Sequence, residues 1–454
     1  MEENMVSAKE LKEIWLRAAN EKPELQARIK DGIEQNRKGD FKVRFIDKQG
    51  NPLKNTKVKF NQKSHEFKFG AHIFMLDEFE KAEDNAKFRE LFKEYFNLAT
   101  VPFYWNGLEP EENKPRYDKD SPKVYRRPAP DLCMQYCVEN GIDTKLHCLV
   151  YDKLTPSWLP KDNMAEMERI YEKRFKEISE RYAGRMVEFE VINETLQIYR
   201  WNTDSVITSK EDLNEWAFSL AKKYFPDETL VINDGEVNED IANKGIWSAY
   251  YLEIENALLK GVPIDKIGIQ HHLFTGATSK TEEEYERSVK TEYLSFADPE
   301  LSFKMLDTLG KFGLPLEITE VTIPTFGEGE EFEELQAEIL KNLYSVWFSH
   351  PLVDTVVYWN QFDGYCYVTV NWNENNCRGG LFHHDLTPKK SAQMLKKLIT
   401  EEWHTEGTLT TDEDGYIEFR GFFGDYEFNV DDEKIIAAFR KNGKKDIDLT
   451  VTAK

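Results

Sequence analysis

The chain has 454 residues, which exceeds one typical domain, and 40% of them are hydrophobic, enough for a large core. Its 83 acidic residues outnumber the 60 Lys and Arg residues, so the formal net charge is -23. This charge argues against nucleic acid and anionic membranes as partners, because both require basic patches. The five cysteines are odd in number and irregularly spaced, which fits neither a zinc site nor a dense disulfide framework.

The N-terminal stretch, MEENMVSAKELKEIWL, has acidic residues and helical periodicity where a secretory signal would have a basic start and an apolar block. No run in the sequence approaches the ~18 apolar residues of a membrane span. The sequence as it stands therefore predicts a cytoplasmic protein that does not enter a membrane, or a secreted one if a signal peptide has been removed.

Residues 1–38 are charged and favour helices, and residues 41–62 have alternating apolar positions on both sides of a Gly-Asn-Pro turn. That pattern predicts a β-hairpin. Similar alternation, interrupted by Asp-Gly and Gly-Asp pairs, returns only in residues 407–430. We expect one small all-β accessory domain that is built from both termini, residues 1–66 and 403–454. Two separate hairpins lying on the central domain are the alternative.

The central part, residues 67–402, alternates short apolar runs with amphipathic segments. Eight runs predict strands at 67–74, 97–103, 144–150, 186–194, 228–234, 266–272, 314–320 and 354–360. Between and after them, helices are predicted near 84–95, 130–139, 164–182, 210–224, 243–260, 299–312, 331–349 and 388–400. Eight strands in this alternation favour an α/β fold of the (β/α)8 TIM-barrel type over a doubly wound sheet.

Polar residues stand at the carboxyl ends of several of these strands, where barrel enzymes keep their chemistry. Glu194 ends the fourth strand and Glu320 ends the seventh. The same rim also carries His147, Asn193, Asn233, Asp234, Gln270, His272, Trp359 and Asn360. No Gly-rich phosphate loop, GxSxG elbow or HExxH motif follows any strand, so no cofactor is expected.

Two carboxylates surrounded by hydrogen-bonding side chains and an aromatic wall indicate glycoside hydrolysis. One carboxyl must stay protonated to donate to the leaving oxygen, and the other must be ionised to attack the anomeric carbon. Asn193 is suited to hold a sugar 2-hydroxyl, His272 to orient Glu320, and Trp359 to pack on the sugar ring. The pair His271-His272 with Glu320 could also be read as a metal site. This is the weaker interpretation, because nothing supplies a third ligand at convincing spacing.

These residues lie in motifs that resemble glycoside hydrolase family 10, the retaining β-1,4-xylanases. The motifs are RYAGRMVEFEVINE, LPLEITEV, VIND, IGIQHH, TPSWL, VVYWNQFD and GGLFHHDLTPKKSAQ, in order over about residues 67–400. The resemblance implies that Glu194 is the acid/base and Glu320 the nucleophile, with carboxyls about 5–5.5 Å apart. It also implies that His147, Asn193, Gln270, His272 and Trp359 line the sugar subsite at the scissile bond.

The chain departs from the family pattern one sugar further out, on the non-reducing side. The usual Glu-Asn-x-Met-Lys-Trp is replaced by 100–105, TVPFYW, and the usual Leu-Val-Trp-His-x-Gln by 149–154, LVYDKL. Tyr104 and Tyr151 fall at altered positions, and Tyr367 falls where the eighth-strand loop usually has a second Trp, near an inserted NWNENNCRGG. We expect these three tyrosines to contact substrate in a remodelled outer subsite.

Three functions therefore remain open on the sequence alone. The first is a retaining hydrolase acting on xylan or xylo-oligosaccharides, and the second is an exo-acting β-glycosidase of the same clan on another β-glycoside. The third is a carbohydrate-binding barrel without catalysis, which the presence of both glutamates disfavours. In the C-terminal β part, Phe422, Phe423 and Tyr426 could bind polysaccharide, but alternating aromatics favour a core role.

Overall fold

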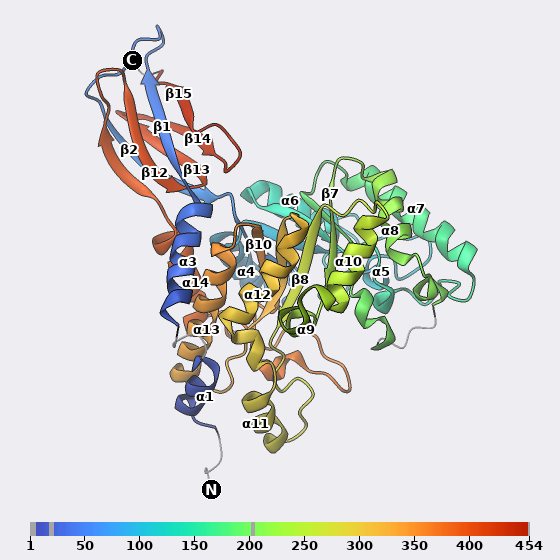
Figure 1. Ribbon diagram of the computed structural model, residues 1–454. Helices are drawn as coiled ribbons and strands as arrows, with labels where there is room; N and C mark the ends of the chain where they lie inside the picture. The colour runs from blue at the N-terminus through green and yellow to red at the C-terminus, as the bar shows by residue number, and fades with distance from the viewer. Residues whose placement is uncertain (1–5, 18–21, 201–204, 453–454) are drawn as a thin grey trace.

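The computed structural model describes residues 6–17, 22–200 and 205–452. Parts of the N-terminal segment expected to be helical (1–5 and 18–21) and the last two residues lie outside this description. Two bodies make up the described chain, an α/β barrel and a smaller all-β unit that projects from one end of it (Figure 1). None of the described helices is long and apolar enough to cross a membrane.

Eight parallel strands close the barrel in the order β10-β3-β4-β5-β6-β7-β8-β9. Their bounds are β3 (Lys68–His72), β4 (Leu98–Pro102), β5 (Asp143–His147), β6 (Glu188–Asn193), β7 (Thr229–Asp234), β8 (Lys266–His272), β9 (Leu316–Thr322) and β10 (Val353–Tyr358). Every residue of β4, β6 and β9 is buried, as expected for parallel strands covered by helices on the outside. The predicted (β/α)8 fold is confirmed.

Helices surround the barrel. They are α4 (Ala82–Tyr95), α5 (Trp105–Leu108), α6 (Pro130–Asn140), α7 (Met164–Tyr182), α8 (Leu213–Tyr224), α9 (Asn238–Lys244), α10 (Ala249–Leu259), α11 (Glu282–Thr291), α12 (Pro299–Leu309), α13 (Glu330–Ser349) and α14 (Lys390–Lys397). Short helical turns are η1 (Asp152–Leu154), η2 (Thr195–Arg200), η3 (Val206–Ser209), η4 (Gly245–Trp247), η5 (Leu294–Ala297), η6 (Gly310–Phe312), η7 (Glu374–Cys377) and η8 (Leu398–Glu402).

Two helical predictions need correction. The helix predicted near 243–260 begins later, as α10 at Ala249: α9 ends at Lys244 and η4 follows, because Gly245 has a φ of +59°, outside the right-handed helical region. Helix α11 was not predicted at all, although Thr281 and Glu284 form a capping box at its start. That pair was the available signal, since a Thr with Glu three residues later commonly begins a helix.

The N-terminal helices pack against the barrel and not against the accessory unit alone. Helices α1 (Ala8–Trp15) and α3 (Pro23–Asn36) run along its side, next to α13 (Figure 1). The Trp15 ring lies 4.7 Å from the Phe326 ring, and its indole N–H donates to the carbonyl of Val289 at 2.9 Å. The sequence segment 1–66 thus supplies a helical cover for the barrel as well as strands of the accessory unit.

Two facing sheets form the accessory unit, with strand orders β12-β1-β15 and β11-β2-β13-β14. The strands are β1 (Lys38–Ile46), β2 (Lys57–His65), β11 (Glu406–Thr410), β12 (Tyr416–Phe422), β13 (Gly424–Val430), β14 (Glu433–Phe439) and β15 (Asp446–Thr450). Side chains from both sheets share one core, in which the Phe41 and Phe439 rings stack with centroids 4.2 Å apart. Each sheet therefore combines one strand from the N-terminal part with strands from the C-terminal part.

The predicted hairpin of residues 41–62 is wrong. Strands β1 and β2 do not pair with each other, since β1 pairs with β12 and β15 whereas β2 pairs with β11 and β13. The alternation correctly marked two half-buried strands, but alternation does not determine the partner strand. The C-terminal aromatics Phe422, Phe423 and Tyr426 are buried, which matches a core role.

Candidate active site

A cleft of about 800 Å³ lies at the carboxyl ends of the barrel strands, at the end of the barrel away from the accessory unit. The strand ends bring together residues that are far apart in the sequence. Eight of the ten predicted site residues line this cleft: Tyr104, Tyr151, Glu194, Gln270, His272, Glu320, Trp359 and Tyr367. The other two, His147 and Asn193, lie behind its wall and are 1% and 2% exposed.

Glu194 immediately follows β6 and is half-buried. Its backbone has a φ of +57° and its N–H donates to the carbonyl of Asn233 at 2.9 Å, which turns the side chain out of the strand into the cleft. The Tyr151 hydroxyl donates to Glu194 Oε2 at 3.0 Å, and Gln270 Nε2 donates to Oε1 at 3.1 Å. Both carboxylate oxygens are therefore oriented by fixed donors.

Glu320 lies within β9, and its side chain is 5% exposed. Asn233 Nδ2 donates to Glu320 Oε1 at 3.3 Å, and His272 Nε2 lies 3.2 Å from Oε2. Burial raises the pKa of Glu320 to about 8, and the charges of Glu190 and Glu194 add to this rise while the His147 charge opposes it. A proton is therefore retained by this group of carboxyls near neutral pH.

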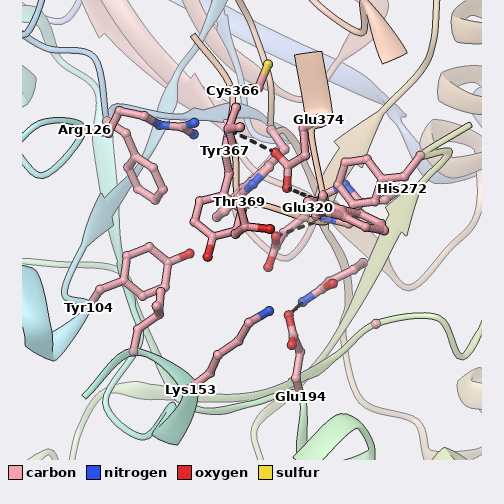
Figure 2. Close-up of a pocket in the computed structure, with 18 of the residues that line it drawn as sticks. Tyr104, Arg126, Lys153, Glu194, His272, Glu320, Cys366, Tyr367, Thr369 and Glu374 are labelled. Carbon is pink, nitrogen blue, oxygen red and sulfur yellow. Dashed lines mark hydrogen bonds and ion pairs between the residues drawn. The ribbon is translucent and has the colours of Figure 1, made fainter. Parts of the chain in front are cut away.

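A chain of side-chain amides joins the two glutamates. Gln270 Nε2, which donates to Glu194, also lies 3.3 Å from Asn193 Oδ1. Asn233 Nδ2 donates to the same Asn193 oxygen at 2.9 Å and reaches Glu320. Figure 2 shows the carboxylates of Glu194 and Glu320 facing the same space. The amide nitrogen of Asn193 donates to no described residue, but Asn193 does not line the cleft, so its contact with a sugar hydroxyl stays a prediction.

His272 is held in one tautomer by its neighbours. Burial lowers the pKa of this imidazole to about 4, so the ring is neutral near pH 7 and carries one proton. Nδ1 lies 3.0 Å from the Thr322 hydroxyl, a suitable donor to it. The proton is then on Nε2, from which His272 donates to Glu320.

His147 does not reach the cleft, because Tyr104 covers it. The Tyr104 hydroxyl lies 2.8 Å from His147 Nε2, and Glu190 Oε1 lies 2.8 Å from Nδ1. Burial is the largest single influence and lowers the pKa of His147, but the charge of Glu190, its hydrogen bond and the charge of Glu320 together outweigh burial, and the pKa is raised. In this structure His147 contacts Tyr104 and does not line the cleft, so a direct contact of His147 with sugar stays a prediction.

A buried ion pair supports this group from inside the barrel. Lys145 Nζ lies 2.6 Å from Glu317 Oε1 and 3.8 Å from Glu190 Oε2, and all three side chains are at most 1% exposed. Neither Glu190 nor Lys145 was singled out from the sequence. Their signal was a charged residue at the centre of an otherwise apolar strand, which is costly unless it is paired.

Aromatic rings form the floor and one wall of the cleft. The Trp359 ring makes edge contacts with the rings of His147 and Phe74, at centroid distances of 5.3 and 5.2 Å. The Tyr104 and Tyr151 rings lie 5.9 Å apart. Of the altered segment 100–105, Tyr104 is the residue that lines the cleft, since residues 100–103 are buried in or next to β4.

The metal reading gains no support among the described residues. His271, one of the three residues considered for it, contacts Asn238 and the Phe296 carbonyl instead of Glu320. His147, Cys148 and Glu190 do lie close enough to share an ion. However, the His147–Glu190 hydrogen bond already accounts for the proximity of those two side chains.

Charged residues that were not predicted also line the cleft. Arg126 and Arg127 come from the long segment between α5 and α6, and Lys153 comes from η1. Glu374, on the inserted loop, accepts from Asn360 Nδ2 at 3.0 Å. These residues follow no strand end and have no periodic pattern, so only the fold brings them to the site.

The geometry agrees with comparisons to known proteins. The sequence model described as Glycosyl hydrolase family 10 matches residues 61–398. Endo-1,4-beta-xylanase B of Thermotoga neapolitana is 25% identical over 327 residues, which cover 70% of this chain and 85% of that protein. Anti-sigma-I factor RsgI6 of Acetivibrio thermocellus is 22% identical over 422 residues, covering 92% of this chain and 46% of that protein.

Endo-1,4-beta-xylanase 1 of Arabidopsis thaliana is 23% identical over 410 residues, 88% of this chain. The chain spans 46% and 37% of the lengths of the anti-sigma-I factor and the Arabidopsis protein, less than half of each. Among solved structures, xylanase 10B from Thermotoga petrophila RKU-1 in complex with xylobiose aligns with a TM-score of 0.56 at 22% identity, over 74% of this chain and 95% of that chain. At this level of sequence identity, the similarity to the solved structure shows a shared fold.

Proposed function

This chain belongs to glycosyl hydrolase family 10, and from that premise we propose that it is a retaining hydrolase of β-1,4-xylosidic bonds in xylan or xylo-oligosaccharides. One observation carries the proposal: Glu194 and Glu320, from the ends of different strands, converge on one cleft and one chain of amide hydrogen bonds. Two carboxyls in such an arrangement are what double displacement at an anomeric carbon requires.

In the proposed first step, Glu320 attacks the anomeric carbon while Glu194 gives its proton to the departing glycosidic oxygen. In the second step, Glu194 takes a proton from water, whose oxygen attacks the same carbon and releases Glu320. The single proton of the pair must lie on Glu194 when Glu320 attacks. Donation by Asn233 and His272 and the charge of His147 favour the ionised form of Glu320.

The outer subsite on the non-reducing side is proposed to be remodelled. At the positions of the family's Glu, Asn and Lys the chain has Thr100, Val101 and Tyr104, and the first two are buried. Each lost sugar hydrogen bond is worth about 0.5–1.5 kcal/mol, and more where a charge takes part. Specificity for plain linear xylan should be weaker than the family pattern implies, so we propose short or decorated xylo-oligosaccharides as better substrates.

The exo-acting alternative has one observation in its favour. The inserted loop is fixed to the loop after β8, since the Asn373 N–H donates to the Ala277 carbonyl at 2.9 Å and Asn376 Nδ2 donates to the Gly276 carbonyl at 3.0 Å. Trp372 packs edge-on against Phe274, with ring centroids 5.2 Å apart. This loop therefore narrows the cleft on the side of β8 and β9, and a blocked end would favour removal of terminal sugars.

A barrel that binds carbohydrate without cleaving it is the remaining alternative, and one relative is named as an anti-sigma factor instead of an enzyme. The two oriented glutamates favour catalysis. Binding of a sugar alone requires neither a buried carboxyl such as Glu320 nor two hydrogen-bond donors that orient each carboxyl.

Time courses on xylotriose to xylohexaose, with products resolved by size and anomer, test the proposal. We expect cleavage with retention at the anomeric carbon. Glu320→Gln should abolish turnover, and Glu194→Gln should lower it by about 10²–10⁴-fold. Glu211→Gln, at an exposed position before α8, is the matched control. Binding without cleavage by the wild-type protein would refute hydrolysis, mixed internal products would refute the exo alternative, and inverted product would refute the mechanism.

A further inference from the structure

One side of the cleft is cationic, although the chain as a whole is strongly acidic. Arg126, Arg127 and Lys153 line the cleft, and none of them has a carboxylate within 4 Å in the described ranges 6–17, 22–200 and 205–452. Three cations left without a carboxylate in one cleft are therefore notable in a protein with this charge.

Arg126 is the most informative of the three. Its side chain is 7% exposed, and its Nε and Nη1 atoms are buried without a hydrogen-bond acceptor in the described part of the chain. Unsatisfied buried donors are costly, and the cost is larger for a charged group. Such a group is well placed for an anionic ligand, because a planar guanidinium matches a carboxylate in geometry and charge.

The neighbours of Arg126 include Tyr104, which stands at a position that the family resemblance assigns to the non-reducing side of the scissile bond. The Arg127 guanidinium stacks over the Tyr104 ring at 4.3 Å, and burial lowers the pKa of Arg127 only to about 10, so it stays charged. Figure 2 shows Arg126 and Tyr104 on one side of the cleft and Glu320 and Glu374 on the other, with the Lys153 side chain extending between them toward Glu194. An anionic ligand group would be repelled by the three glutamates and attracted by the cations.

We propose that the Arg126 side of the cleft binds the carboxylate of a uronic acid residue carried by the substrate. Arg126 makes the direct contact, and Arg127 and Lys153 supply positive potential beside it. The inference rests on the proposed function, since it names the decoration of the sugar chain on which the same site acts. It also accounts for the loss of the family's Glu, Asn and Lys at positions 100, 101 and 104, because a charge-assisted contact elsewhere in the cleft takes over their part in recognition.

The test compares two substrates that differ only in charge. One is a xylo-oligosaccharide that carries a glucuronic acid substituent, and the other is the same compound with the carboxyl reduced to an alcohol. We expect the wild-type protein to prefer the acidic substrate by roughly 10- to 100-fold in kcat/KM, mainly through KM, since charge-assisted hydrogen bonds have this magnitude. The preference should fall as ionic strength rises.

Variants assign the preference to residues. Arg126→Met and Lys153→Met should each reduce the ratio of the two kcat/KM values by at least about fivefold, whereas Lys119→Met, at an exposed position outside the cleft, should not change it. Lys153 is exposed, so its variant tests the inference even where Arg126→Met does not fold. An unchanged ratio in Lys153→Met and in a folded Arg126→Met overturns the assignment.

The outcomes separate this inference from the proposed function. Cleavage of both substrates at equal rates overturns the uronate site and leaves the hydrolase standing. If neither is cleaved, the hydrolase is overturned; titration of the Glu320→Gln variant with the two compounds then decides the uronate site. Binding of the acidic compound at least about tenfold more tightly supports the site, and equal binding overturns it.

Discussion

Replacing Glu320 with Gln should make the protein more stable near neutral pH and slightly less stable in acid. In the wild-type protein, burial raises the pKa of Glu320 to about 8 from 4.5. The folded protein therefore binds this proton more tightly than the unfolded chain does. Stability from the protonated carboxyl is fully present below the unfolded pKa and is lost as the pH rises through the folded pKa. Glutamine has no proton to lose.

The size of the effect follows from the two pKa values. At pH 4 the titration contributes almost nothing, at pH 7 it lowers wild-type stability by about 3 kcal/mol, and above pH 8 by at most about 5 kcal/mol. The amide nitrogen of Gln accepts no hydrogen bond, whereas both oxygens of the carboxyl can, so one of the contacts with Asn233 and His272 is lost. That loss costs about 1 kcal/mol at every pH. The curves of the two proteins should therefore cross.

Thermal unfolding of both proteins between pH 4 and pH 8 measures this difference. The barrel transition is the relevant one, because a chain with two bodies need not unfold in one step. A barrel of this size shifts by about 1.5 °C per kcal/mol, so the variant should melt roughly 3 °C higher at pH 7. Glu211→Gln, at an exposed position outside the cleft, is the control for removal of one surface carboxyl. A constant offset between wild type and Glu320→Gln across this pH range would refute the reasoning.

Three other substitutions test different parts of the structure. Tyr151→Phe removes the donor to Glu194 Oε2 and should lower kcat/KM on xylo-oligosaccharides about 10-fold without changing the melting temperature; unaltered kinetics would contradict the positioning role. Lys145→Met leaves Glu317 buried without its partner and should cost about 3–5 kcal/mol in urea unfolding, a cost that a further Glu317→Leu change should largely remove. Phe41→Ala in the accessory core should cost about 3–5 kcal/mol there, seen as an earlier unfolding step with the initial hydrolysis rate retained; loss of activity in the folded variant would show that the two bodies depend on each other.

The barrel could be predicted from sequence because its strands are buried on both faces. Each appears as a short apolar run, and the two glutamates stand out because they interrupt or end such runs at strands β6 and β9. Pairing in the accessory unit could not be predicted in the same way. Alternation shows which face of a strand is buried, whereas the choice of β12 or β2 as the neighbour of β1 depends on residues at the other end of the chain.

The site was predictable where it follows strand ends and unpredictable where it comes from loops. Gln270, His272 and Trp359 lie at strand ends and line the cleft as expected. Arg126 and Lys153 lie in connecting segments, where no periodic pattern marks a residue as facing a cleft. His147 is separated from the cleft by the Tyr104 ring. Spacing along the chain does not show that the Tyr104 side chain lies over His147 in the folded protein.

Strands from the N-terminal and C-terminal parts of the chain pair in both accessory sheets, and this pairing affects folding during synthesis. Strands β1 and β2 leave the ribosome before the whole barrel, and their partners in the C-terminal part follow only after about 20–70 seconds of elongation at ordinary rates. For that interval the nascent chain carries two strands with unpaired edges, which are open to association with neighbouring chains. Chaperone demand should therefore be highest before release, and completion of the C-terminus is the event that ends it.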